Sequence, residues 1–130
     1  MDRLIDLKRK DLAKAVAGLE KALRLNVEPD VARDVTLMRF SFTSELAWKV
    51  LKLYIEGAGG AEIVMPKDAY RGAQQRQLLA PEETEMALQM VSDRNRLAHD
   101  YSEKFAQALY GRIKSDYSLL LRNIFDRMSS

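Results

Sequence analysis

Apolar residues recur along this chain with the three- and four-residue spacing of helices that bury one face. The stretch from about Asp2 to Arg24 carries one such stripe, formed by Leu12, Val16, Leu19 and Leu23. A final stretch from near Ser102 to about Met128 carries another, formed by Leu109, Ile113, Leu120 and Ile124. The pattern therefore predicts an amphipathic helix at each end of the chain.

The second periodic stretch, from Asp30 to about Glu56, is apolar on two sides. Asp30 is a residue type that can cap the start of a helix, and the glycine-rich run 57–60 ends the pattern. One stripe is formed by Val35, Met38, Phe42, Leu46 and Leu53. The other is formed by Leu37, Phe40, Ala47, Leu51 and Tyr54. We expect such a helix at the centre of a bundle, or packed against another subunit as well.

Two prolines mark the starts of two further helices. Pro66 suits the first turn of a short helix to about Gln77, and Pro81 opens a helix whose first turn contains Glu82 and Glu83. No alternating run of β-branched residues predicts a strand. The sequence therefore predicts an all-α fold, an antiparallel up-and-down bundle of four main helices plus one short helix, with residues 1–130 in a single domain.

The composition of the chain excludes several kinds of functional site. The 130 residues contain no cysteine and one histidine, which excludes thiolate chemistry and a multi-histidine metal site in one chain, and we expect neither a metal nor a cofactor. A net charge of +2, from 21 basic and 19 acidic residues, does not indicate nucleic-acid binding unless charge gathers in a local patch. No apolar run reaches the ~18 residues of a membrane span, and no export signal is visible, so we expect a cytoplasmic protein without membrane contact.

One segment breaks the apolar pattern, and it reads RNRLAHDY from residue 94 to residue 101. Arg94 lies on the stripe of the fourth helix, which otherwise consists of Met86, Met90, Leu97 and Tyr101. An arginine on a core-facing stripe is costly unless its guanidinium finds partners or opens onto a groove. It can also pack its aliphatic stem and keep its head in water. The segment is therefore the candidate site, with a structural role for Arg94 as the alternative.

These side chains suit phosphate chemistry. Arginine can bind a phosphate through two parallel hydrogen bonds, and histidine can exchange a proton near neutral pH. Arg94 and His99 are five residues apart, about 140° around a straight helix, whereas Arg94 and Tyr101 are nearly eclipsed. Arg94 and His99 can converge in one protomer only if the helix bends or ends near His99. Otherwise each contributes to a cleft shared with a partner chain.

Two motifs resemble those of known families. Arg94, Asn95 and His99 match the R-N-x-x-x-H form of the HEPN (higher eukaryotes and prokaryotes nucleotide-binding) motif. With Tyr101 they also fit the R-x4-H-x-Y pattern of HEPN toxins that are paired with minimal nucleotidyltransferases. The run from Arg39 to Lys49 is similar to the R-F-x-x-T-x-E-L-A-W-K signature of the nucleotidyltransferase substrate-binding protein family. The resemblance covers most of the chain and implies an antiparallel helical bundle.

The resemblance also implies a partner and residue roles. Members of the family are encoded beside a small nucleotidyltransferase. In some HEPN relatives, which are metal-independent ribonucleases, the residues that match Arg94 and His99 act on RNA at a dimer cleft. In the paired toxins, AMP is transferred to the tyrosine that matches Tyr101. Asn95 and Glu45 belong to the same candidate nucleotide- or RNA-binding set. The resemblance assigns no role to Glu45 itself, and we expect it to pair with an arginine in the cleft.

Three functions follow as hypotheses. The first is a nucleotide- or substrate-binding partner subunit of a minimal nucleotidyltransferase, the HEPN half of a toxin–antitoxin-type pair. The second is a metal-independent ribonuclease that uses Arg94 for the scissile phosphate and His99 as acid or base. The third is a structural helical dimer in which Arg94 pairs with Asp93 or Glu45 of a neighbour. The chain lacks a nucleotidyltransferase signature of its own, and its two-sided second helix predicts a homodimer at least.

Overall fold

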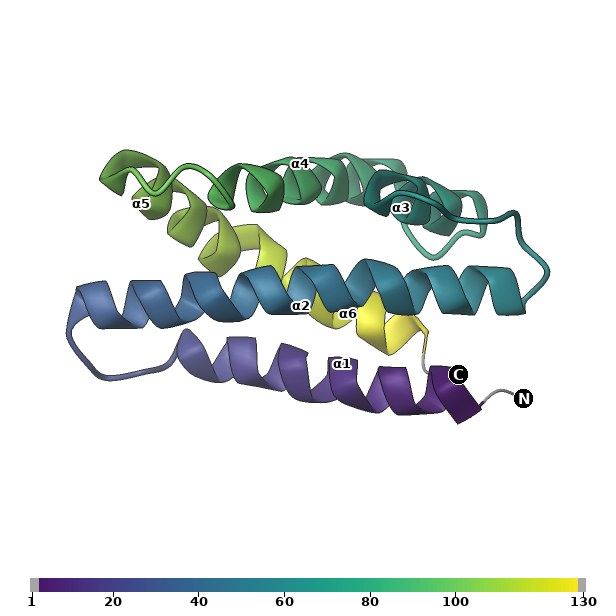
Figure 1. The fold of residues 1–130 in the computed structure, drawn as a ribbon, viewed down its shortest axis with the longest axis horizontal. Helices are drawn as coiled ribbons and strands as arrows, with labels where there is room; N and C mark the ends of the chain where they lie inside the picture. Colours follow the sequence, from purple (N-terminus) through teal and green to yellow (C-terminus); the bar gives the residue numbers. More distant parts are fainter. Residues whose placement is uncertain (1–2, 129–130) are drawn as a thin grey trace.

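The computed structural model describes residues 3–128, which form a helical bundle without a strand in that range. Figure 1 shows the long helices running back and forth along one axis. The elements are α1 (Arg3–Ala22), α2 (Pro29–Gly57), α3 (Pro66–Gln75), α4 (Pro81–Leu97), α5 (Glu103–Arg112), the π-helical turn η1 (Ile113–Tyr117) and α6 (Ser118–Arg127). The predicted antiparallel all-α bundle is confirmed, although the expected first helical residue, Asp2, lies outside the described residues. Among residues 3–128, no helix combines the length and the apolar composition that a membrane crossing requires.

The segment from Glu103 to Arg127 is one continuous helix with a widened turn. Backbone angles stay in the right-handed helical region at both junctions, at Arg112 and at Ser118. The helix starts where the sequence predicts, because the Ser102 hydroxyl accepts a hydrogen bond from the backbone N–H of Phe105 at 3.3 Å. With α5, η1 and α6 counted as one rod, the bundle has four long helices and the short helix α3.

α2 is the central helix, since it contacts every other α-helix of the described residues. Its inward stripe includes Phe40 and Leu51, and Phe40 stacks on Tyr117 with ring centroids 5.7 Å apart. On the other stripe, Met38 and Phe42 are 64% and 63% exposed. The two-sided pattern therefore corresponds to one core face and one face that leaves large apolar side chains uncovered in a single chain.

A proline sets the start of α2 and two glycines shape the turn after its end. The start corrects the sequence analysis, which expected Asp30 to cap this helix. Pro29 is the first helical residue, so Asp30 lies within the first turn and does not cap the helix. Proline fits this position because the first-turn N–H groups have no acceptor within the helix. Beyond the other end, Gly59 has a φ of 87°, and a Cβ at Gly60 would lie 2.6 Å from Cγ2 of Ile55. This tight exit therefore requires glycine.

Candidate functional site

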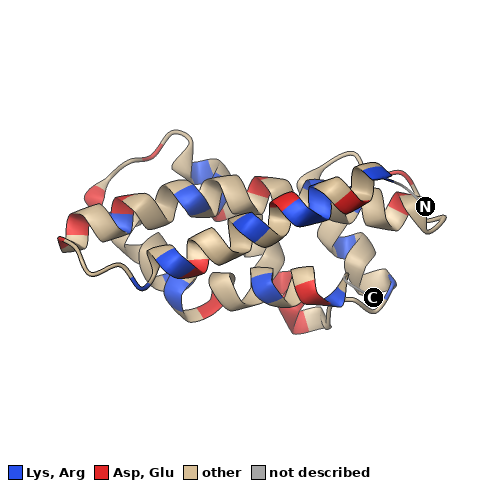
Figure 2. Ribbon diagram, turned by 90° about the horizontal axis from the view of Figure 1, so that it is seen from below, with Lys and Arg blue, Asp and Glu red and all other residues tan. Residues whose placement is uncertain are grey.

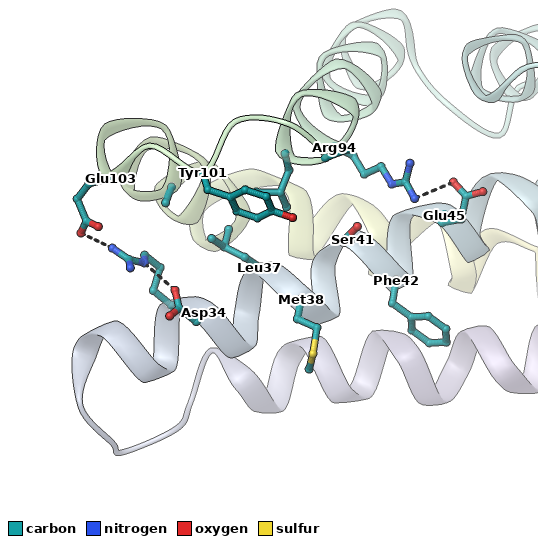
Figure 3. Close-up of a pocket in the computed structure, with 13 residues that line it drawn as sticks. Asp34, Leu37, Met38, Ser41, Phe42, Glu45, Arg94, Tyr101 and Glu103 are labelled. Atoms are coloured by element: carbon teal, nitrogen blue, oxygen red, sulfur yellow. Dashed lines mark hydrogen bonds and ion pairs between the residues drawn. The ribbon is translucent and has the colours of Figure 1, made fainter.

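A cleft of about 790 Å³ lies between α2, α4 and α5. Its floor is apolar and buried, and is formed by Leu37, Leu97 and Ala106. Its rim carries three exposed side chains, those of Met38, Phe42 and Tyr101. Figure 3 shows Arg94 and Glu45 at one end of the cleft, and Asp34 and Glu103 at the other. The cleft is therefore apolar in the middle and charged at both ends.

Arg94 of α4 forms an ion pair with Glu45 of α2, and Nη2 of the arginine lies 3.5 Å from Oε1 of the carboxylate. Glu45 also accepts a hydrogen bond from Nε1 of Trp48 at 3.2 Å and pairs with Nζ of Lys49 at 3.2 Å. Burial by itself would raise the pKa of Glu45, but these bonds and the charge of Arg94 outweigh it and hold the pKa below its usual value. Glu45 thus pairs with an arginine in the cleft, as expected in the sequence analysis.

Arg33, which the sequence analysis missed, occupies the other end of the cleft. Its side chain is buried and pairs with Asp34 of α2 and Glu103 of α5. The only feature of the sequence that could have indicated a buried Arg33 is its position four residues before Leu37, on the buried stripe. The cleft thus contains two arginines, each already paired, and three carboxylates. An anion that binds Arg94 must therefore displace Glu45 or share the guanidinium with it.

The turn after α4 separates His99 from Arg94 within one chain. α4 ends at Leu97, and the backbone N–H of His99 donates to the carbonyl of Arg96 at 3.1 Å. His99 is exposed and does not line the cleft, whereas Arg94 does. Asn95 is exposed and borders a smaller cavity beside Arg94. α4 thus ends near His99, which is one of the conditions under which the two side chains could converge, but the turn that follows does not bring His99 into the cleft of Arg94 within a single chain.

Tyr101 reaches the cleft from a loop. Because α4 ends at Leu97, Tyr101 does not continue the helical stripe of Arg94, which corrects the geometry expected from the sequence. Asp100 holds this loop by accepting hydrogen bonds from the backbone N–H of Ser102 at 3.0 Å and from Nε of Arg96 at 2.8 Å. The same two bonds lower the pKa of Asp100 to about 2. The Tyr101 side chain is 80% exposed, and Figure 3 shows its hydroxyl directed into the cleft, toward the side where Arg94 lies.

Asp93, which in the sequence is only a neighbour of Arg94, is a buried anchor between α4 and the last helix. Its carboxylate accepts hydrogen bonds from Nε of Arg112 at 2.9 Å and from the hydroxyl of Tyr117 at 2.5 Å. Burial raises the pKa of Tyr117, and the charge of Asp93 adds to the effect. Asp93 and Glu45 thus both have partners within their own chain, which removes the need for the intersubunit pairs of the structural-dimer hypothesis.

Behind the Arg94–Glu45 pair lies a second cavity, of only about 10 Å³, which Trp48 and Tyr70 also line. The fully buried hydroxyl of Tyr70 has no hydrogen-bond partner among residues 3–128, and neither does Nε of Arg94. Burial raises the pKa of Tyr70, and the negative charge of Glu45 adds to this shift. Sequence analysis missed Tyr70, because an aromatic residue on the buried side of a short helix resembles ordinary core.

The chemistry open to the cleft follows from these groups. Arg94 can bind an anion that competes with Glu45, and the exposed phenol of Tyr101 can accept a transferred group. His99 can exchange protons only at a site assembled outside this cleft or with a second chain. Within residues 3–128, histidine, aspartate and glutamate side chains do not gather into a group of three or more that could hold a metal ion.

Solved structures with the same fold define the class of the protein. A protein from Thermus thermophilus is 35% identical, over 92% of this chain and 99% of that one, with a TM-score of 0.84. The tri-AMPylated HEPN toxin of Shewanella oneidensis, in complex with MNT antitoxin, is 13% identical over 98% of both chains, with a TM-score of 0.78. A toxin–antitoxin structure with AMP-PNP is 11% identical over 100% of this chain and 99% of that one, with a TM-score of 0.79. The bundle therefore has the HEPN fold.

The family follows from the sequence. Residues 7–130 match the model described as nucleotidyltransferase substrate binding protein like, and the chain belongs to this family. No functionally curated protein matches it. The resemblance drawn from the Arg39–Lys49 run and from the motif at Arg94 is thereby confirmed.

Proposed function

We propose that this chain is the HEPN-fold partner subunit of a minimal nucleotidyltransferase, in a toxin–antitoxin-type pair. Family membership supports this proposal, as does the likeness in fold to a HEPN toxin that is AMPylated and in complex with MNT antitoxin. The observation that carries it is the exposed phenol of Tyr101 at the rim of the cleft that contains Arg94. An exposed phenol on a fixed loop is open to a second protein that carries ATP.

Tyr101 is the acceptor in this proposal. Its hydroxyl oxygen attacks the α-phosphorus of ATP on the partner, the bond from that phosphorus to the bridging oxygen breaks, and pyrophosphate leaves. The phenolic proton passes to solvent or to a base of the partner. The phosphodiester product keeps a negative charge in the cleft, where it competes with Glu45 for Arg94. The transferred AMP group thus fills the cleft and binds the guanidinium of Arg94.

The test is incubation of the purified chain with the nucleotidyltransferase encoded beside it and ATP, followed by mass spectrometry. We expect an AMP adduct on the wild type and on the control Tyr110→Phe, and none on Tyr101→Phe. An adduct that persists in Tyr101→Phe would place the acceptor elsewhere. No adduct with a partner that is otherwise active would leave only the binding role.

The second candidate function is a metal-independent ribonuclease built by two copies of the chain. It is favoured by the exposed motif residues Asn95 and His99 and by the uncovered side chains Met38 and Phe42, which suit a homodimer interface. Arg94 of one protomer would bind the scissile phosphate and His99 of the other would act as acid or base, with Asn95 beside the RNA. This composite site supplies the pairing that a single chain does not make.

Mixing variants separates this candidate from the first. Arg94→Ala and His99→Ala homodimers should each lose RNA cleavage. A heterodimer of the two should regain it, because one of its two clefts contains an intact Arg94 and an intact His99 from different chains. Heterodimers that stay inactive while the wild type cleaves RNA would contradict a shared site. A wild type that cleaves no RNA would remove the ribonuclease candidate and leave the Tyr101 proposal intact.

A further inference from the structure

Charge is distributed unevenly between α1 and the rest of the chain. Residues 3–24 contain seven basic and three acidic side chains, a net charge of +4, whereas the whole chain carries +2. All other residues together therefore carry −2, which is +2 minus +4. Figure 2 views the bundle from the α1 side, and the blue of Lys and Arg recurs along the helix nearest the viewer. The near-neutral composition thus conceals a local basic surface.

Five of these cations form one line, which we call the α1 basic line: Arg3, Lys10, Lys14, Lys21 and Arg24. All five are exposed. Spacings of seven, four and seven residues keep the four cations of α1 within about 40° of one another around the helix, and Arg24 extends the line into the following turn. At 1.5 Å per residue, the line is about 32 Å long.

The charge of this line is only partly offset among residues 3–128, where the charge of Arg24 helps to lower the pKa of Glu20. None of its five side chains forms an ion pair with a carboxylate among residues 3–128, although most other arginines of the chain do. Of the three acids on α1, Glu20 is turned toward α6, where its Oε1 lies 2.8 Å from Nη2 of Arg122. Asp6 and Asp11 lie to either side of the line, about 60–80° away around the helix. The positive field along the line therefore faces solvent.

We propose that the α1 basic line binds the phosphodiester backbone of a nucleic-acid duplex. A protein–protein interface needs a buried apolar or aromatic centre. Only Leu7 and Ala17 lie between the cations of the line, so this surface lacks such a centre. A row of exposed cations without an aromatic stacking platform suits contacts to phosphates, which position a protein on a nucleic acid without reading its bases. No residue of α1 lines the cleft, so this surface is separate from Tyr101 and independent of its modification.

The test measures binding to a fluorescein-labelled 2′-O-methyl-RNA hairpin, which a ribonuclease that needs the 2′-hydroxyl cannot cleave, with a stem of about 16 base pairs. A DNA hairpin of the same sequence shows whether RNA geometry matters. The test variant is Lys10→Gln/Lys14→Gln/Lys21→Gln. The control, Lys67→Gln/Lys104→Gln/Lys114→Gln, removes the same charge from other surfaces. Glutamine preserves helix propensity, and circular dichroism checks the fold.

We expect the test variant to bind the RNA hairpin at least tenfold more weakly at about 0.1 M salt, and to lose about two to three units from the slope of log K against log salt, since three phosphate contacts are lost. The control should bind like the wild type. Equal losses in both variants would reduce the effect to net charge and overturn the proposal, as would no loss in either. If the test variant binds the hairpin like the wild type but no longer forms a complex with the adjacent nucleotidyltransferase, the line is a protein interface. That result would also overturn the proposal.

Discussion

Arg94 on α4 and Glu45 on α2 form an ion pair, with Nη2 3.5 Å from Oε1, at one end of the apolar cleft. The pair explains how an arginine is tolerated on an apolar stripe: its stem packs between helices, and its head, on a side chain that is 32% exposed, meets a carboxylate. A phosphate that binds the guanidinium must therefore displace Glu45 or share Arg94 with it. For an anion that enters the cleft as proposed above, this competition lowers the affinity.

Glu45→Gln should raise the affinity of the cleft for AMP severalfold, because it removes the competing charge and keeps the shape of the side chain. The loss in free energy of unfolding should stay below about 1 kcal/mol, since both partners are partly exposed. Titration calorimetry and urea unfolding measure the two effects. Glu20→Gln is the control, because the Glu20–Arg122 pair is similarly exposed but lies outside the cleft. Weaker AMP binding by Glu45→Gln would contradict the competition.

Asp93→Asn should lower the free energy of unfolding by about 2–3 kcal/mol. The amide keeps the volume of the buried carboxylate but cannot accept charge-assisted bonds from both Arg112 and Tyr117. Urea unfolding measures the loss. Asp68→Asn, which breaks an exposed pair with Arg71, should change stability by less than about 0.5 kcal/mol. Equal effects of the two substitutions would show that the buried network does not stabilise the fold.

Tyr70→Phe should leave the protein as stable or make it more stable by about 1 kcal/mol, because it removes a buried hydroxyl that lacks a protein partner. Tyr117→Phe is the matched comparison, since that hydroxyl donates to Asp93, and it should lose about 1–2 kcal/mol. Thermal and urea unfolding of both variants measure the difference. A similar loss in Tyr70→Phe would mean that its hydroxyl is hydrogen-bonded to solvent in the folded protein.

Asp100 should give the loop of Tyr101 a dependence on acid pH. Its pKa falls from the ordinary 3.8 to about 2 because the backbone N–H of Ser102 and Nε of Arg96 donate to the carboxylate. Its contribution to stability is therefore complete only above about pH 5, declines as the pH falls below the unfolded pKa, and is lost as the pH falls through about 2. The difference in unfolding free energy between wild type and Asp100→Asn should shrink over that window. A carboxyl carbon that titrates near 3.8 by NMR would exclude these bonds in solution.

Phe42→Glu should convert a homodimer to a monomer, because it places a charge among the uncovered apolar side chains of α2. Leu119→Glu is the control, since Leu119 on α6 is 64% exposed and Phe42 is 63% exposed. Light scattering at micromolar concentration measures the assembly. A wild type that is monomeric would remove the shared-cleft argument for Arg94 and His99, whereas loss of the dimer in Leu119→Glu would place the interface elsewhere.

The sequence by itself determines the bundle and locates its candidate site. Helical periodicity is local and repeats over many residues, so the stripes of α1, α2 and the last helix are readable without any knowledge of their partners. Prolines and glycines mark helix ends for equally local reasons, with Pro29 displacing Asp30 from the capping position. The two motifs that include Glu45 and Arg94 identify the family. What lies within a helical turn, or within a contiguous motif, is thus predictable.

Only the tertiary structure decides which charges meet. Arg94 and Glu45 are 49 positions apart, and Asp93 and Tyr117 are 24 apart, so packing between helices and not periodicity pairs them. α4 ends at Leu97, and the loop that follows places Tyr101 at the cleft and leaves His99 outside it. The hydrogen bonds that Asp100 accepts from Arg96 and Ser102 hold this loop. Arg33 and Tyr70 look like stripe residues until the helices that surround them are known. Side-chain partners depend on long-range packing, whereas helix formation depends mainly on near neighbours, and this difference separates what the sequence determines from what the fold decides.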